Sequence, residues 1–168
     1  PSVRAIERLR SQAGLGDKAQ SGYVQAIPFA DCKFDMLVMC EVMEHLDDAT
    51  LRRGLAEVRR VLKPGGILLA TTPFREKLAA SMVVCPDCGK VFHKVGHVQS
   101  FDRVRMTAVL QEAGFLIRKL YVTTFVDWRR GGVKNLAKSL TRKMLARFGE
   151  GIADPHLVIL ARKLTVGH

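Results

Sequence analysis

The sequence has few cysteines, few aromatic residues and no long apolar run. Four cysteines in 168 residues are too few for a disulfide scaffold, so we expect a reduced, cytoplasmic setting. No apolar run approaches the roughly 18 residues that a membrane-spanning helix needs, and the first residues do not form a charged and then apolar signal segment. Hydrophobic residues make up 48% of the chain and charged residues 26%, which excludes a disordered chain and indicates a globular domain.

Negative charge is scarce in the second half of the chain. The net charge is +11, of which residues 1–84 carry +2 and residues 85–168 carry +9. Such a basic half is typical of proteins with an anionic partner, such as nucleic acid, a membrane surface or a phosphorylated substrate. A basic helix face that is only solvated would give the same count, so both interpretations stay open.

Two apolar runs flank a helical pattern near the middle of the chain. Residues 35–40 and 67–72 show no polar alternation, which predicts strands buried on both faces, as in a parallel sheet. Between them, leucine and valine recur at i, i+4, i+7 and i+11 from Leu51, and the aspartates at 47–48 can cap this helix. The Lys-Pro-Gly-Gly sequence at 63–66 ends it. Strand, helix and strand predict a right-handed parallel crossover.

The remaining pattern predicts a single α/β domain over residues 1–168. Its other expected elements are a helix over 2–13, a short strand over 23–27, a helix over 102–113, strands over 115–124 and 156–162, and a basic amphipathic helix over 133–148. We find no internal repeat and no low-complexity tract in the sequence.

Three segments in a fixed order resemble one enzyme family. They are Ile-Pro-Phe-Ala-Asp-Cys-Lys-Phe-Asp at 27–35, Glu-Val-Met-Glu-His-Leu at 41–46 and Arg-Val-Leu-Lys-Pro-Gly-Gly at 60–66. Together they resemble the class I S-adenosylmethionine-dependent methyltransferases, and most closely the subgroup that includes ubiquinone and menaquinone biosynthesis enzymes. The resemblance covers residues 1–80 and implies a Rossmann-like sheet, with S-adenosylmethionine lying across the carboxyl ends of the strands.

The resemblance also implies which residues border the cofactor. Tyr23 and Val24 stand where the family borders the adenine, and Cys40 and Glu41 where it borders the methionine part. Many relatives have an aspartate at the position of Tyr23. The family's glycine-rich loop and ribose-binding acidic residue are missing from the sequence, so the first two strands of the family sheet would lie upstream of Pro1. We therefore expect an N-terminally incomplete methyltransferase domain.

Glu41, Glu44 and His45 form a polar group directly after the first apolar run. On a helix the spacing i, i+3, i+4 gathers these side chains, and two carboxylates with an imidazole can hold a divalent metal or act as acid and base. The alternative is that Glu44 and His45 only brace the turn after the strand. If the group is catalytic, His45 is the candidate base and Glu44 its partner.

Residues 85–97 contain a second candidate site. Cys85, Cys88, His93 and His97 have the spacing C-x2-C-x4-H-x3-H, which offers two thiolates and two imidazoles to one ion. Tetrahedral zinc matches this set, and four protein ligands would make the zinc structural. The interval between the pairs is too short for a DNA-reading zinc finger. The sequence thus predicts a zinc-knuckle insertion; two free cysteines beside surface histidines are the alternative, and a redox Cys-x-x-Cys pair is less favoured.

The predicted function is methyl transfer from S-adenosylmethionine to a small-molecule or lipid-linked acceptor. The basic helix at 133–148 would either lie on an anionic membrane or show its charges to water. A zinc-containing basic module that binds nucleic acid is the alternative from another class, although the aromatic content of 7% is low for a protein that stacks on bases. A non-catalytic methyltransferase-like subunit is a third interpretation.

Overall fold

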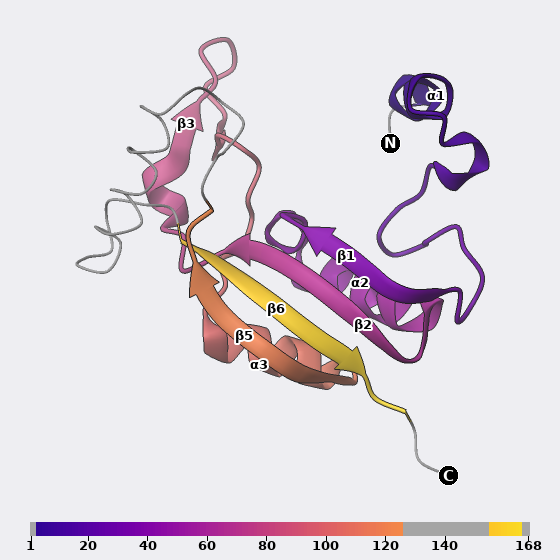
Figure 1. Cartoon of the computed structure of the whole chain (residues 1–168). Helices are drawn as coiled ribbons and strands as arrows, with labels where there is room; N and C mark the ends of the chain where they lie inside the picture. Colours follow the sequence, from indigo (N-terminus) through magenta and orange to yellow (C-terminus); the bar gives the residue numbers. More distant parts are fainter. Residues whose placement is uncertain (1–2, 126–154, 166–168) are drawn as a thin grey trace, which may run out of the picture.

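The computed structural model describes residues 3–125 and 155–165, which are built around a four-stranded sheet (Figure 1). The strand order is β1-β2-β6-β5, with β1 and β5 at the two edges of the described sheet. The strands span Phe34–Cys40 (β1), Leu62–Pro73 (β2), Phe115–Thr123 (β5) and His156–Lys163 (β6). β1 and β2 are parallel, and β6 runs antiparallel to both of its neighbours.

The helix between β1 and β2 confirms the predicted parallel crossover. α2 spans Asp48–Val61, and the Asp47 side chain caps it by accepting a hydrogen bond from the backbone N–H of Thr50. β2 begins at Leu62, five residues before the predicted start. The extra residues are accommodated by a shift in register, because Phe34 pairs with Leu62 whereas Met36 pairs with Ile67.

The second half of the sheet also follows the predicted pattern. α3 spans Arg103–Glu112, begins at the predicted cap Asp102 and is followed by Gly114 with a φ of 78°. β5 and β6 occupy the ranges expected from the sequence to within one residue. The basic helix predicted at 133–148 lies outside the described residues.

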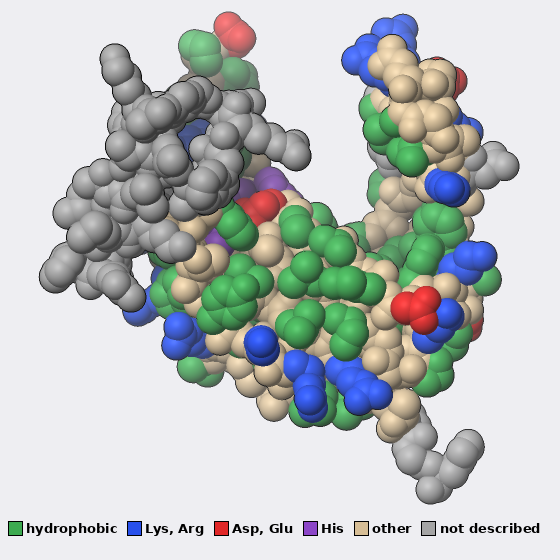
Figure 2. All heavy atoms as spheres, viewed as in Figure 1, with side chains coloured by type: hydrophobic (Ala, Val, Ile, Leu, Met, Phe, Trp, Pro, Cys, Tyr) green, Lys and Arg blue, Asp and Glu red, His purple; other side chains and the backbone are tan. Residues whose placement is uncertain are grey.

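The hydrophobic core lies between the sheet and the two helices α2 and α3, which cover the same face (Figure 1). Leu55 of α2, Met106 of α3 and Ile159 of β6 are all buried within it. The opposite face is open in the described residues, and Figure 2 shows hydrophobic side chains gathered over it. The prediction that residues 35–40 are buried on both faces is therefore wrong, because Met36 and Val38 point to this open face and are about half exposed.

The segment before β1 departs from the predicted strand over 23–27. Tyr23 and Ala26 form only an isolated bridge within a turn, in which the N–H of Ala26 donates to the carbonyl of Tyr23. The residues have strand-forming side chains but no neighbouring strand to pair with. The first helix is confirmed as α1 (Val3–Gln12), which Figure 1 shows to one side of the sheet and which leads into the short η1 turn (Gly16–Lys18).

The predicted insertion after β2 folds into a small hairpin. A 3-10 turn (η3, Leu78–Ser81) leads into β3 (Met82–Val84), which pairs with β4 (Val91–His93). Another 3-10 turn, η2 (Met43–His45), connects β1 to α2. Within the described ranges, no helix has both the length and the apolar content to cross a membrane.

Candidate functional site

Acidic and imidazole side chains gather at one end of the sheet, where the carboxyl ends of β1 and β2 lie; this end is called the carboxyl edge below. They are Glu41, Glu44, His45, Glu76, His93, His97 and His156. Most follow the carboxyl end of β1 or β2, and His156 begins β6, which runs in the opposite direction and so starts at the same edge. In open α/β sheets, the carboxyl ends of the strands are where ligands bind.

Glu41 turns the chain at the end of β1. Its φ of 53° is uncommon for a residue other than glycine, and its N–H donates to the carbonyl of Thr71 at 3.0 Å. Its carboxylate accepts a hydrogen bond from the hydroxyl of Thr71 at 2.7 Å and lies 3.3 Å from Nε2 of His156. Glu41 is therefore tied to β2 and β6, apart from the other two members of the predicted Glu41–Glu44–His45 group.

Glu44 is a buried carboxylate with one satisfied oxygen. Only 1% of the residue is exposed, and the chain after β4 contacts it through the N–H of Val98, which donates to its carbonyl at 2.8 Å. Its Oε2 accepts a hydrogen bond from the hydroxyl of Thr72 at 2.9 Å. Its Oε1 has no hydrogen-bond partner in the described part of the chain. A buried carboxyl oxygen without a hydrogen-bond partner costs free energy, so Oε1 is an available acceptor in this site.

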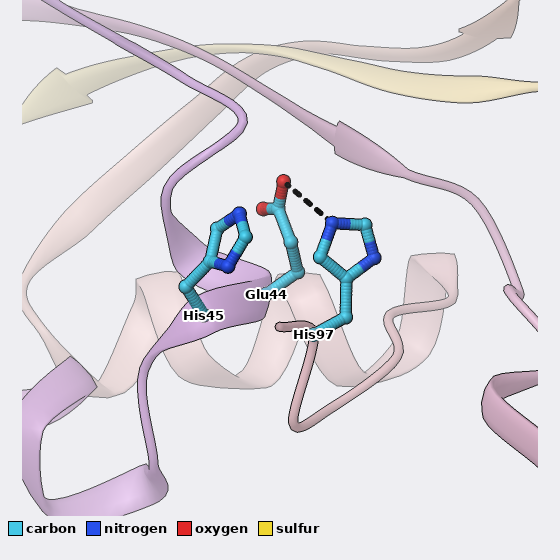
Figure 3. A group of neighbouring side chains, drawn as sticks. All are labelled: Glu44, His45 and His97. Atoms are coloured by element: carbon cyan, nitrogen blue, oxygen red, sulfur yellow. Dashed lines mark ion pairs between the residues drawn. The ribbon is translucent and has the colours of Figure 1, made fainter. Parts of the chain in front are cut away.

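His45 is exposed, and one of its ring nitrogens has a defined role. Nδ1 lies 3.1 Å from the carbonyl oxygen of Gly96. A carbonyl can only accept, so Nδ1 carries the proton and Nε2 keeps its lone pair. The ring also stands edge-on to His97, with 4.7 Å between the ring centroids. Figure 3 shows the rings of His45 and His97 on either side of the Glu44 carboxylate.

His97 lies between two carboxylates. Its Nδ1 is 2.5 Å from Oε2 of Glu76, and its Nε2 is 3.9 Å from Oε1 of Glu44 (Figure 3). The backbone N–H of His97 donates to Nδ1 of His93, which places the His93 proton on Nε2. That nitrogen is 3.4 Å from Oε1 of Glu76. His97 therefore holds the Glu76 carboxylate by a hydrogen bond, whereas Nε2 of His93 lies near it without one among the described residues.

Two overlapping groups of three could hold a metal ion. Glu44, His45 and His97 form one, and Glu76, His93 and His97 the other; in each, the potential ligand atoms lie within 4.8 Å of one another. Two imidazoles and one carboxylate suit a divalent transition metal. Without a metal, the same groups can orient an imidazole and move a proton.

The structure does not bring the four predicted zinc ligands together. His93 pairs with Met82 at the base of the hairpin, whereas Cys85 and Cys88 lie in the turn at its other end. Neither cysteine belongs to a group of potential metal ligands in the described ranges. The two cysteines do stay close to each other. Hydrogen bonds from the backbone N–H groups of Cys88 and Asp87 lower the pKa of the Cys85 thiol.

The four predicted cofactor-binding residues fall in two places. Cys40 is exposed at the end of β1, next to Glu41 at the edge of the sheet. Tyr23 is largely exposed and Val24 packs against Gly54 of α2.

Sequence analysis missed four residues of this site. Thr71 and Thr72 support the glutamates, Glu76 orients His97, and His156 contacts Glu41. The position of the threonines at the end of a predicted strand was a usable signal. Glu76 had no local signal, because its role depends on how the hairpin returns to the sheet.

The N-terminal part of the chain is similar in sequence to known methyltransferases. A family model described as a methyltransferase domain matches residues 1–70. A probable S-adenosylmethionine-dependent methyltransferase from Mycolicibacterium smegmatis is 30% identical over 94 residues, which are 56% of this chain and 33% of that protein. The matches span 23% to 33% of the length of the curated relatives.

Solved structures share the fold over most of the chain. A SAM-dependent methyltransferase from Methanosarcina mazei has a TM-score of 0.62 at 19% identity, covering 97% of this chain and 79% of that one. The 1,6-didemethyltoxoflavin-N1-methyltransferase of Burkholderia thailandensis, solved with S-adenosylhomocysteine, has a TM-score of 0.58 at 13% identity, covering 92% and 56%. The sequence matches and these structures together support a class I methyltransferase, and the chain has the fold of S-adenosylmethionine-dependent methyltransferases.

Proposed function

We propose that this protein is a methyltransferase that moves a methyl group from S-adenosylmethionine to a small-molecule or lipid-linked acceptor. The observation that carries the proposal is the gathering of glutamates and histidines at the carboxyl edge of β1 and β2. In a chain with a methyltransferase fold, this is the edge where cofactor and acceptor would meet.

We propose that the end of β1 holds the methionine part of the cofactor, through Cys40 and Glu41. The tight turn at Glu41 supports this, because it places the exposed side chain of Glu41 at the carboxyl end of β1 while its N–H stays bonded to Thr71. Tyr23 and Val24 would border the adenine. Val24 packs on α2, so that contact would depend on backbone groups and on the exposed ring of Tyr23.

Methyl transfer requires the acceptor to be positioned in line with the methyl group and a base to take one proton from the acceptor. The bond between the methyl carbon and the sulfonium sulfur breaks with its electrons staying on sulfur, while an acceptor lone pair forms the new bond to carbon. The acceptor proton then goes to a base. His45 can take it at Nε2, because its Nδ1 proton is committed to the carbonyl of Gly96. Glu44 lies beside it and would stabilise the charged imidazole.

The positive charge of the second half of the chain is the basis for the partners that we propose. A lipid-linked acceptor agrees with a basic, amphipathic sequence at 133–148 that could lie on an anionic membrane, a segment outside the described residues. Nucleic-acid binding has less support, because it depends on net charge alone, and seven of the fifteen Lys and Arg of the basic half fall within 126–154.

Titration calorimetry with S-adenosylhomocysteine tests the proposal. We expect the protein to bind it, because the chain has the fold of S-adenosylmethionine-dependent methyltransferases. The substitution Glu41→Gln should weaken binding by roughly tenfold, the effect of losing one charge-assisted hydrogen bond. The exposed Glu112→Gln, near the end of α3, is the matched control and should leave affinity unchanged.

Two outcomes would contradict the proposal. If the parent protein does not bind S-adenosylhomocysteine, the chain is a methyltransferase-like subunit that does not use the cofactor. If the two glutamine variants bind equally well, the edge after β1 is not the methionine site.

A further inference from the structure

We propose that Glu44, His45 and His97 bind a divalent transition-metal ion. The ligand atoms would be Oε1 of Glu44, Nε2 of His45 and Nε2 of His97. This site differs from the Cys85, Cys88, His93 and His97 set predicted from the sequence, and it joins the turn after β1 to the loop after β4. Metal binding here does not depend on methyl transfer.

Hydrogen bonds fix the second polar atom of all three side chains. Oε2 of Glu44 accepts from Thr72, Nδ1 of His45 donates to the carbonyl of Gly96, and Nδ1 of His97 donates to Glu76. Each contact orients its side chain and leaves the other polar atom with an available lone pair. Metal-binding histidines are held in this way, with the second ring nitrogen donating to a carbonyl or a carboxylate.

The second group, Glu76 with His93 and His97, also contains a buried atom without a hydrogen-bond partner, Nε2 of His93, but in the neutral ring that atom carries a proton and offers no lone pair. Nδ1 of His93 accepts from the N–H of His97, so its Nε2 carries the proton and cannot bind a metal as a neutral ring. Oε2 of Glu76 already accepts from Nδ1 of His97. These contacts make Glu76 and His93 positioning residues, which aim Nε2 of His97 at Glu44.

The buried oxygen of Glu44 is the observation that points to a cation. Its residue is 1% exposed, and Oε1 has no hydrogen-bond partner among the described residues. Nε2 of His97 forms an ion pair with Oε1 of Glu44 at 3.9 Å. That separation is too long for a hydrogen bond and slightly longer than the roughly 3.4 Å between two ligands of a tetrahedral zinc ion, so a bound ion would draw the two side chains together by about half an ångström. A bound cation would give Oε1 the partner that it lacks.

The ligand chemistry favours zinc and similar ions over magnesium. Two neutral imidazoles and one carboxylate suit Zn²⁺, Mn²⁺, Fe²⁺ or Co²⁺, whereas Mg²⁺ prefers oxygen ligands alone. Three protein ligands leave a coordination position open for water or, if the proposed function holds, for an acceptor oxygen. With the metal bound, Nε2 of His45 serves as a ligand and no longer as a base.

Metal titrations of five proteins test the site. Zn²⁺ binding is measured by calorimetry for the parent chain, Glu44→Gln, His45→Ala, His93→Ala and the double variant Cys85→Ser with Cys88→Ser. We expect Glu44→Gln and His45→Ala to weaken binding by more than about 100-fold, beyond the roughly 10–100-fold that loss of an outer partner such as His93 costs. The cysteine variant should bind like the parent.

The absorption spectrum of bound Co²⁺ distinguishes nitrogen and oxygen ligands from thiolate ligands. We expect visible bands of a nitrogen and oxygen site, without the intense near-ultraviolet band that thiolate ligands give. His45 is exposed, so its substitution spares the core, and circular dichroism of metal-free His45→Ala confirms that it folds. The proposal is overturned if the parent binds neither ion, if His45→Ala binds Zn²⁺ like the parent, or if a thiolate band appears and is lost with the cysteines. S-adenosylhomocysteine binding is measured separately, so failure of this site leaves the proposed function standing.

Discussion

Each glutamate or histidine of the site has two polar side-chain atoms, and a hydrogen bond to one of them decides which atom remains available for binding or catalysis. The N–H of His97 and its Nδ1 both serve to hold neighbours, and this leaves only Nε2 for chemistry. Glu44 and His45 could be selected from the sequence, because adjacent residues after a predicted strand share one turn. Their partner His97 was assigned to the cysteines instead, because local spacing does not reveal which end of a hairpin reaches the sheet.

A residue-scale prediction concerns the cap of α3. Oδ1 of Asp102 accepts a hydrogen bond from the N–H of Arg105 at 2.8 Å. Asp102→Ala removes that partner and should lower the free energy of unfolding by about 0.5–2 kcal/mol. Asp102→Asn keeps an accepting oxygen and should stay within a few tenths of a kcal/mol of the parent, as an order-of-magnitude expectation. Urea denaturation measures both; equal stability of the alanine variant and the parent would show that the cap contributes nothing.

At the scale of elements, an arginine of α2 fastens the segment before β1. Arg60 donates to the carbonyls of Ile27 and Phe29 and to the carboxylate of Asp31. Glu57, one turn earlier in α2, accepts from Arg60 and from the N–H of Ile27. The helix thus holds the loop that contains the family-like sequence at 27–35, and it does so through several charge-assisted hydrogen bonds.

This contact should make stability depend on pH. The hydrogen bond from Arg60 holds the pKa of Glu57 below its usual value. Its contribution is therefore complete above the pKa that Glu57 has in the unfolded chain, and is lost as pH falls through the lower pKa of the folded state. We expect Glu57→Gln to be less stable than the parent at pH 7 and to approach it in acid. Denaturation at several pH values measures this, with Glu112→Gln as the control; a stability gap that stays constant into acid would contradict it.

The elements themselves were predictable wherever one periodicity dominated. α2 and α3 follow apolar stripes with an aspartate cap, and β5 and β6 follow apolar runs, so their ranges agree closely. The short segment at 23–27 failed because strand-forming residues need a neighbouring strand. The exposure of Met36 and Val38 was also not predictable, since an apolar run does not show whether both faces of its sheet are covered.

For the whole molecule, the proposed metal would link segments far apart in the sequence. η2 supplies Glu44 and His45, and the loop after β4 supplies His97. A ligand that binds only the folded chain stabilises it, by about 2.7 kcal/mol at a free concentration 100 times the dissociation constant. We expect Zn²⁺ at that level to raise the melting temperature of the parent, chelator to reverse the rise, and His45→Ala to show none. Equal shifts in the two proteins would place the binding elsewhere.

The loop that carries His97 also provides the carbonyl of Gly96, which sets the proton on His45. A single surface segment thereby determines the state of a residue in another part of the chain. The sheet and helices can stay unchanged while exchange of that segment between related proteins alters the chemistry at the sheet edge, as loops on a rigid scaffold allow. The hairpin and its loop are thus the part of the chain whose exchange would change the proposed metal site without rebuilding the sheet.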